Sequence, residues 1–75
     1  MELNEAISKR IVMLCHDRGI SLDHLVTKAN ADPQAVMAVV NGNKDFASLG
    51  VMGAICLALG ITVTEFYNHP IFEGF

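Results

Sequence analysis

The sequence predicts an all-α protein, folded as a compact bundle of five helices. Apolar residues recur at intervals of three and four through most of the chain, which is the spacing of one helix face and not the alternation of a strand. Serine, threonine or aspartate precedes most of these segments, and glycine or asparagine follows them, as at helix ends. A chain of 75 residues can enclose one small hydrophobic core. We therefore expect a single domain over residues 1–75.

The first helix is expected over residues 3–18. Its apolar residues recur at helical spacing: Leu3, Ile7, Ile11 and Leu14. Glu2 and Glu5 lie near the positive end of this helix and Arg18 near its negative end, as the helix dipole prefers. Gly19 is the expected stop, because glycine readily takes the left-handed conformation that ends helices.

Residues 21–42 predict two short helices joined by a tight turn. Ser21 is the expected N-cap of the first helix, whose apolar side consists of Leu22, Leu25, Val26 and Ala29. Asn30 is expected in the left-handed conformation at its end. Asp32 then caps the second helix and Pro33 opens it, where a missing N–H does no harm. The second helix buries Val36, Val39 and Val40. Helix, turn and helix in this order form a helix-turn-helix motif.

The last third of the chain predicts two more helices and a tail. Ser48 is the expected N-cap of a helix through residue 59, with an inward stripe of Leu49, Met52, Ile55, Cys56 and Leu59. Gly60 ends this helix. Thr62 and Glu65 then form a capping box that opens a short fifth helix. Pro70 interrupts helical structure in the C-terminal tail, residues 68–75.

The composition disfavours several classes of protein. Apolar residues make up 52% of the chain, yet no apolar run reaches the roughly 18 residues of a membrane helix. The N-terminal residues also lack the basic-then-apolar order of a secretion signal. We therefore expect a cytoplasmic protein outside the membrane.

Cys15 and Cys56 are expected as buried free thiols rather than as a disulfide. Scattered histidines and cysteines predict no metal site, and no cofactor is expected.

Several segments carry a family resemblance through their order and spacing. They are residues 6–11 in the first helix, 18–21 before the second, Leu25 within it, 41–44 after the third, 55–61 at the end of the fourth and 62–66 in the fifth. In these segments the sequence resembles the Cro/phage-repressor-like (xenobiotic-response-element type) helix-turn-helix family, especially its short single-domain bacterial transcriptional regulators. The resemblance extends over about residues 2–72. It implies the lambda-repressor-like DNA-binding fold, with the motif at the second and third helices.

The resemblance implies a transcriptional regulator that places its third helix in the major groove of duplex DNA. The base-facing positions that carry over are Gln34, Ala35, Met37 and Ala38. Among these, Gln34 has the amide group that can read adenine. The phosphate-facing positions are Asn41, Asn43, Lys44, Ser48 and Lys28. Arg10 either reaches a phosphate or pairs with a Glu or Asp of a neighbouring helix, and the intramolecular pair is favoured.

The motif also departs from the family, and the departures keep a second interpretation open. Leu22 stands where a phosphate-contacting glutamine is usual, and Met37 and Ala38 replace outward polar residues. Residues 21–48 hold two lysines and three aspartates, a formal charge of −1, and the whole chain carries −3. Attraction to phosphate is therefore weak. The alternative function is a protein-interaction module of the same fold, with an apolar third helix and little or no direct DNA binding.

The fourth helix has an apolar outer face, predicted to consist of Gly50, Gly53, Ala54, Leu57 and Ala58. A glycine inside an exposed helix costs about 1 kcal/mol relative to alanine, so we expect close packing against this face. Apolar residues of the tail add to the same expectation. The sequence thus favours a homodimer with an interface of Gly50, Gly53, Leu57, Phe66, Tyr67, Ile71 and Phe72. The alternative is that the tail, including Phe75, folds back onto its own core.

Enzymatic activity has no support in the sequence. The histidines are expected on the surface, without a carboxylate or cysteine at catalytic spacing: His16, His24 and His69. The serines are explained as helix-surface or cap residues: Ser8, Ser21 and Ser48. Glycines are scattered and form no phosphate-binding loop. We therefore expect a protein that is not an enzyme.

Overall fold

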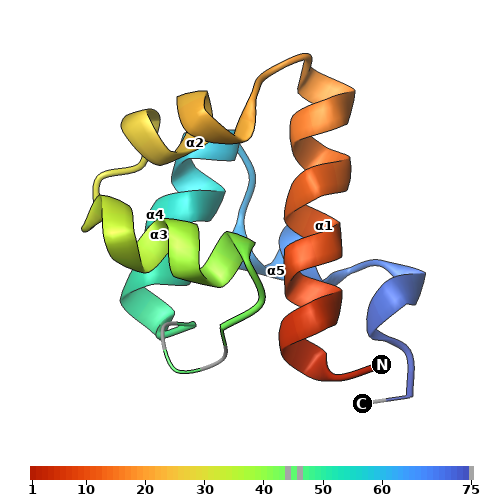
Figure 1. Ribbon diagram of the computed structural model, residues 1–75. Coiled ribbons are helices and arrows are strands. Elements are labelled where there is room, and N and C mark those ends of the chain that lie inside the picture. Colours follow the sequence, from red (N-terminus) through yellow and green to blue (C-terminus); the bar gives the residue numbers. More distant parts are fainter. Residues whose placement is uncertain (44, 46, 75) are drawn as a thin grey trace.

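A computed structural model describes residues 1–43, 45 and 47–74 of the chain (Figure 1). Its helices are α1 (Leu3–Arg18), α2 (Leu22–Lys28), α3 (Pro33–Val40), α4 (Leu49–Leu59) and α5 (Val63–Tyr67), followed by a short 3₁₀-helix, η2 (Pro70–Phe72). The described residues form helices and connecting turns, with no strand among them. The predicted all-α, five-helix architecture is confirmed.

Side-chain caps fix the helix starts where the sequence placed them. The hydroxyl of Ser21 accepts a hydrogen bond from the backbone N–H of His24 at 3.0 Å, and that of Ser48 accepts one from Val51 at 3.3 Å. At α5 the predicted capping box is present. A second capping box, between Glu2 and Glu5, opens α1 and was not predicted from the sequence. These local bonds satisfy the donors that a helix start leaves free.

The turn between α2 and α3 differs from the prediction at Asn30. In the described part of the chain, positive φ angles occur at glycines alone, so the left-handed conformation expected at Asn30 is wrong. The chain instead leaves α2 through an extended Ala29, with φ −68° and ψ 132°. Ala29 is buried in the core, and its methyl group is placed there by the extended backbone. Burial of this side chain therefore shapes the turn.

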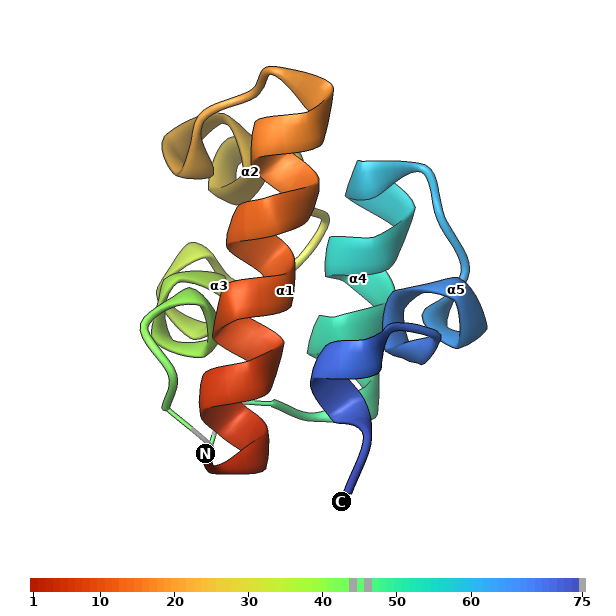
Figure 2. The ribbon, with the colours of Figure 1, turned by 90° about the vertical axis from the view of Figure 1, so that its right-hand side faces the viewer.

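The core lies between α1, the α2–α3 pair and α4. Its fully buried side chains come from all five helices: Ile11, Leu25, Val36, Val39, Ile55, Cys56 and Phe66. Figure 2 shows α3 on one side of α1, with α4 and α5 on the other. Cys15 and Cys56 are buried and free, as predicted. None of the helices in the described residues has the length and hydropathy needed to cross a membrane.

Two residues of α4 differ from the prediction in burial. Leu49, expected in the inward stripe, is 81% exposed at the first position of the helix. Ala58, expected on the outer face, is buried at 8% exposure. The short α5 packs against α4 and adds a contact surface that the periodicity of α4 alone does not reveal.

The C-terminal tail folds back onto the domain, as the alternative interpretation proposed. η2 packs against α1, and Phe72 contacts the core, with its ring centroid 5.9 Å from that of Phe66 and 4.9 Å from that of Tyr67. Phe66 was predicted at an exposed dimer interface, but it is fully buried because it forms the inward side of α5. Phe75 lies outside the described residues.

Candidate nucleic-acid interface

One side of α3 faces outward and carries most of the predicted base-facing residues. Gln34 is exposed in the first turn, Met37 and Ala38 are half-buried, and Asn41 is exposed at the C-cap. The opposite side is buried and consists of Ala35, Val36, Val39 and Val40. An α-helix with its side chains is about 10–12 Å in diameter, and the DNA major groove, about 12 Å wide, admits it. The outward side therefore has suitable dimensions for groove insertion.

Ala35 does not belong to this outward side. It is only 8% exposed, and it lies one turn before the buried Val39 on the same side of α3. The family resemblance placed Ala35 among the base-facing positions, but its helical spacing from Val39 puts it on the inward side. The outward set is therefore Gln34, Met37, Ala38 and Asn41.

Two polar residues of α1 hold the C-terminal end of α3 in place. The side-chain amide of Asn4 donates to the carbonyl of Gly42, and the hydroxyl of Ser8 donates to the carbonyl of Val40. A helix end leaves such carbonyls without partners inside the helix. These contacts were not predicted from the sequence, although Asn4 and Ser8 lie four residues apart and so share one face of α1. Their bonds fix the orientation of α3 relative to the rest of the domain.

Asp32 caps the start of α3 and places a carboxylate there. Its carboxylate accepts a hydrogen bond from the backbone N–H of Gln34 at 3.0 Å, which confirms it as the N-cap. This contact places a negative charge beside the outward residue Gln34. A carboxylate stabilises the helix at this position, but it also occupies a donor that a phosphate would use. Helix stability and phosphate binding therefore oppose each other here.

The remaining phosphate-facing candidates are distributed around the same motif. Lys28 is exposed in the last turn of α2, and Ser48 is exposed at the N-cap of α4. The side-chain oxygen of Asn43 accepts a hydrogen bond from the backbone N–H of Asp45 at 3.1 Å, so Asn43 also shapes its own loop. Lys44 lies outside the described residues. Among the described residues of the loop after α3, the group available to a phosphate is therefore the side-chain amide of Asn43.

Both arginines bind the C-terminal ends of helices. Arg10 donates from Nε to the carbonyl of Phe66 at 2.9 Å and from Nη2 to that of Glu65 at 3.2 Å, both in α5. The expected pairing of Arg10 with a Glu or Asp side chain is therefore replaced by these carbonyl contacts. Arg18 donates from Nε to the carbonyl of Leu59 at 2.7 Å, at the end of α4. A guanidinium suits this position because helix C-termini are partly negative.

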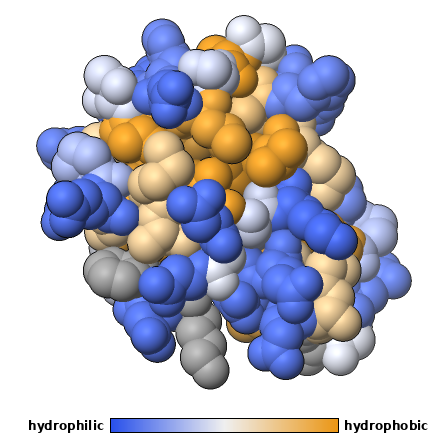
Figure 3. Space-filling view, viewed as in Figure 1, coloured by the Kyte–Doolittle hydropathy of each residue, from blue (hydrophilic) through white to orange (hydrophobic). Residues whose placement is uncertain are grey.

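The charges of the motif are consequently sparse. Among the described residues of segment 21–48, Lys28 is the cation, whereas Asp23, Asp32 and Asp45 carry negative charge. Figure 3 shows hydrophobic residues gathered where α2 and α3 meet α1, with hydrophilic residues around them. From α2 and α3, Leu22, Val26 and Met37 are half-buried and packed against the core. The face is therefore more apolar than that of a protein that holds DNA mainly through charge.

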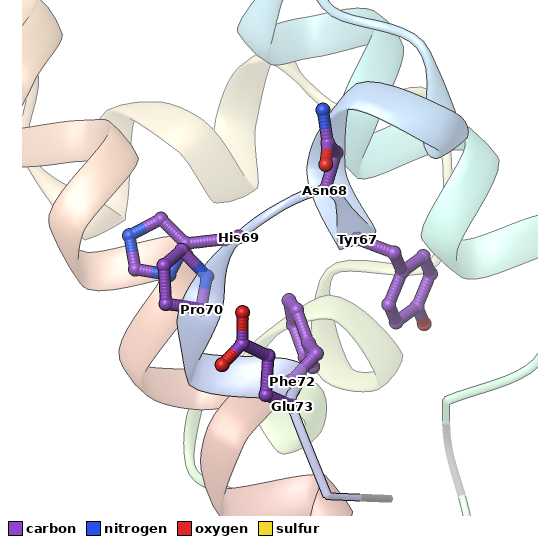
Figure 4. Close-up of a pocket in the computed structure, with 6 residues that line it drawn as sticks. All are labelled: Tyr67, Asn68, His69, Pro70, Phe72 and Glu73. Carbon is purple, nitrogen blue, oxygen red and sulfur yellow. The ribbon is translucent and has the colours of Figure 1, made fainter.

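A shallow hollow lies at the turn from α5 into η2 (Figure 4). It is lined by Tyr67, Asn68, His69, Pro70, Phe72 and Glu73. The Nδ1 atom of His69 accepts a hydrogen bond from the backbone N–H of Ile71 at 3.0 Å, so this histidine caps η2. Among the described residues, no group of three or more metal-ligating side chains forms here or elsewhere. The lining residues thus serve to build the turn that returns the tail to α1.

Two short helices joined by a turn and supported by α1 and α4 define the helix-turn-helix class. A family model described as the Cro/C1-type HTH DNA-binding domain matches residues 10–70. The match includes the whole motif and most of the chain, so the protein belongs to the Cro/C1-type helix-turn-helix DNA-binding family, as the sequence resemblance implied. No curated protein and no solved structure matches the chain.

Proposed function

We propose that this protein is a cytoplasmic transcriptional regulator, without catalytic activity, that binds duplex DNA as a homodimer through α3. Membership of the Cro/C1-type DNA-binding family supports DNA binding in general. The observation that carries the finer proposal is the outward side of α3, where Gln34 is exposed beside the half-buried Met37 and Ala38. In this arrangement Gln34 contacts a base edge, and the two apolar side chains approach the floor of the groove.

Phosphate contacts would position the domain on the duplex. Lys28 supplies a charge, while Asn41, Asn43 and the N-cap Ser48 supply hydrogen-bonding groups around the same side of the motif. Lys44 is proposed as the second phosphate-contacting cation from its place in the sequence. Paired motifs of this class read two half-sites on one side of the duplex, which requires a dimer.

The outer face of α4 supports the proposed dimer. Leu49 and Leu57 are 81% and 77% exposed, although both are large apolar side chains. A Cβ atom added at Gly50 or Gly53 would meet nothing within 4 Å among the described residues, so packing against them does not explain these glycines. Leu49, Gly53 and Leu57 recur every four residues along one side of the helix. A two-fold axis at Gly53 would pair Leu49 of one protomer with Leu57 of the other.

A matched pair of lysine variants tests the DNA proposal. Fluorescence anisotropy with the DNA around the protein's own gene is measured at low and at moderate salt, for the wild type, Lys28→Ala and Lys9→Ala. Both lysines are exposed, but Lys9 lies on α1 outside the motif. We expect Lys28→Ala to reduce the salt slope of the binding constant by about 1, and Lys9→Ala to leave it unchanged. Absence of binding by the wild type at low salt would refute the proposal.

A protein-interaction module of the same fold is the second candidate function. The hydrophobic residues gathered where α2 and α3 meet α1 in Figure 3 favour it, together with the excess of aspartate in the motif. In this alternative, the half-buried Leu22, Val26 and Met37 contact a protein partner in place of DNA. The same titration separates the two candidates, because a protein-interaction module gives no anisotropy change with DNA even at low salt.

A further inference from the structure

We propose that α3 selects A·T base pairs, with Gln34 reading adenine and with Met37 and Ala38 contacting the C5-methyl groups of thymine. The inference rests on the proposed use of α3 as the recognition helix and specifies which duplexes it prefers. It follows from the chemistry of the outward side of this helix, where an exposed amide stands beside two apolar side chains.

Each base pair offers a different set of groups in the major groove. Guanine is read mainly by arginine or lysine, and cytosine by an acidic side chain. From Pro33 to Val40 the sequence of α3 is PQAVMAVV, which contains neither kind of residue. The nearest carboxylate, that of Asp32, accepts the hydrogen bond that caps the helix. The outward side of α3 therefore lacks the side chains that most often read a G·C pair.

The same side complements an A·T pair. The amide of Gln34 offers one donor and one acceptor, which match N7 and the N6 amino group of adenine. Met37 and Ala38 follow Gln34 by three and four residues and so lie beside it on the helix surface. Their spacing along the axis is about 5–6 Å, or less than two base-pair steps. One adenine and the methyl groups of neighbouring thymines can therefore be contacted together.

The half-buried state of Met37 fixes the apolar part of this surface. Met37 packs against the hydrophobic core from the outward side of α3, so one side of its flexible chain is held by the domain. Ala38 is also half-buried and adds a methyl group without a flexible side chain. A thymine methyl group gains apolar contact with both residues, whereas cytosine presents no methyl group there. The preference for thymine thus depends on Met37 and Ala38, two side chains that are partly held by the fold.

Selection from a randomised pool of 30-base-pair duplexes, at low salt, tests the inference with the full chain. We expect the enriched half-site to contain two or three adjacent A·T pairs. Anisotropy is then measured on the selected duplex and on copies in which individual thymines are replaced by uracil, or adenines by 7-deazaadenine. Loss of one contacted methyl group should weaken binding about fourfold. Loss of the adenine N7 acceptor should weaken it by about fivefold or more.

Variants separate the contacts. Gln34→Ala should lose the sensitivity to 7-deazaadenine and keep the sensitivity to uracil, whereas Asn68→Ala, an exposed amide outside the motif, should keep both. Circular dichroism verifies that the variants are folded. A G·C-rich enriched site, equal enrichment of all sequences, or equal affinity for thymine and uracil duplexes would overturn the A·T preference and leave the proposed function standing. No binding to any duplex would overturn both and favour a protein partner.

Discussion

Asp32 links the stability of α3 to its proposed contact with DNA, and substitutions there should change the two in opposite directions. Its carboxylate accepts the hydrogen bond from the N–H of Gln34 at 3.0 Å and caps the helix. Removing an N-cap costs about 1 kcal/mol, and loss of the favourable charge at the helix N-terminus adds about 0.3–1 kcal/mol. Asp32→Ala should therefore lower the free energy of unfolding by about 1–2 kcal/mol. In a domain of this size the melting temperature falls by roughly 5–15 °C.

Asp32→Asn separates the cap from the charge. Asparagine caps a helix about as well as aspartate, so most of the stability is retained. The variant lacks the carboxylate, whose repulsion of a phosphate about 8–10 Å away is about 0.4–0.5 kcal/mol in water. We expect DNA affinity to rise about twofold per protomer, or about fourfold for a dimer. Thermal unfolding followed by circular dichroism and anisotropy at low salt measure the two effects.

The control for this prediction is Asp17→Asn, which makes the same change of charge in the last turn of α1. It should leave DNA affinity unchanged. If Asp32→Ala melts at the wild-type temperature, the capping bond does not stabilise α3 as argued. If Asp32→Asn binds DNA more weakly than the wild type, Asp32 does not face phosphate, and α3 is not presented to the duplex as proposed.

Three further predictions concern assembly and stability. Leu57→Glu should give a monomeric mass by light scattering. The control Leu3→Glu, at another exposed leucine, should keep the dimer. A monomeric wild type at high concentration would contradict the proposed interface. Arg18→Met removes the hydrogen bond to the last turn of α4 and should lower the free energy of unfolding by about 1 kcal/mol, measured by urea denaturation. Burial raises the pKa of the Cys15 and Cys56 thiols, with Arg18 opposing part of the effect at Cys15. Because the unfolded thiols ionise first, stability should be full below about pH 9 and fall as the pH rises further, and a double Cys→Ala variant should lose much of this dependence.

The bounds of the helices could be predicted because each depends on neighbouring residues. Ser21, Asp32, Ser48 and Thr62 cap the helices that follow them, and these bonds join residues two or three positions apart. Such contacts can be predicted from the residues next to each helix end. The turn after α2 was predicted less well, because the conformation at Ala29 follows from burial of its methyl group in a core built from distant segments.

The candidate site was predicted in part, for a similar reason. Gln34, Met37 and Ala38 lie on the outward side of α3, but Ala35 lies on its buried side. Whether an alanine faces inward depends on which helices cover α3, and alanine has no polar or bulky group that would indicate it. Phe66 shows the same limit, since only the docking of α5 against α4 decides that its ring is buried.

Both arginines are engaged in contacts within the fold and are not part of the proposed DNA-binding side. Arg10 and Arg18 come from α1 and bind carbonyl groups at the ends of α5 and α4, so they join the first helix to the last two. These contacts span more than 40 residues of sequence and stabilise the arrangement of the bundle. With both guanidinium groups engaged there, the proposed affinity for DNA would depend largely on the outward groups of α3. Under the proposed use of α3, non-specific attraction contributes little, and discrimination between sequences would depend on the short outward side of this helix.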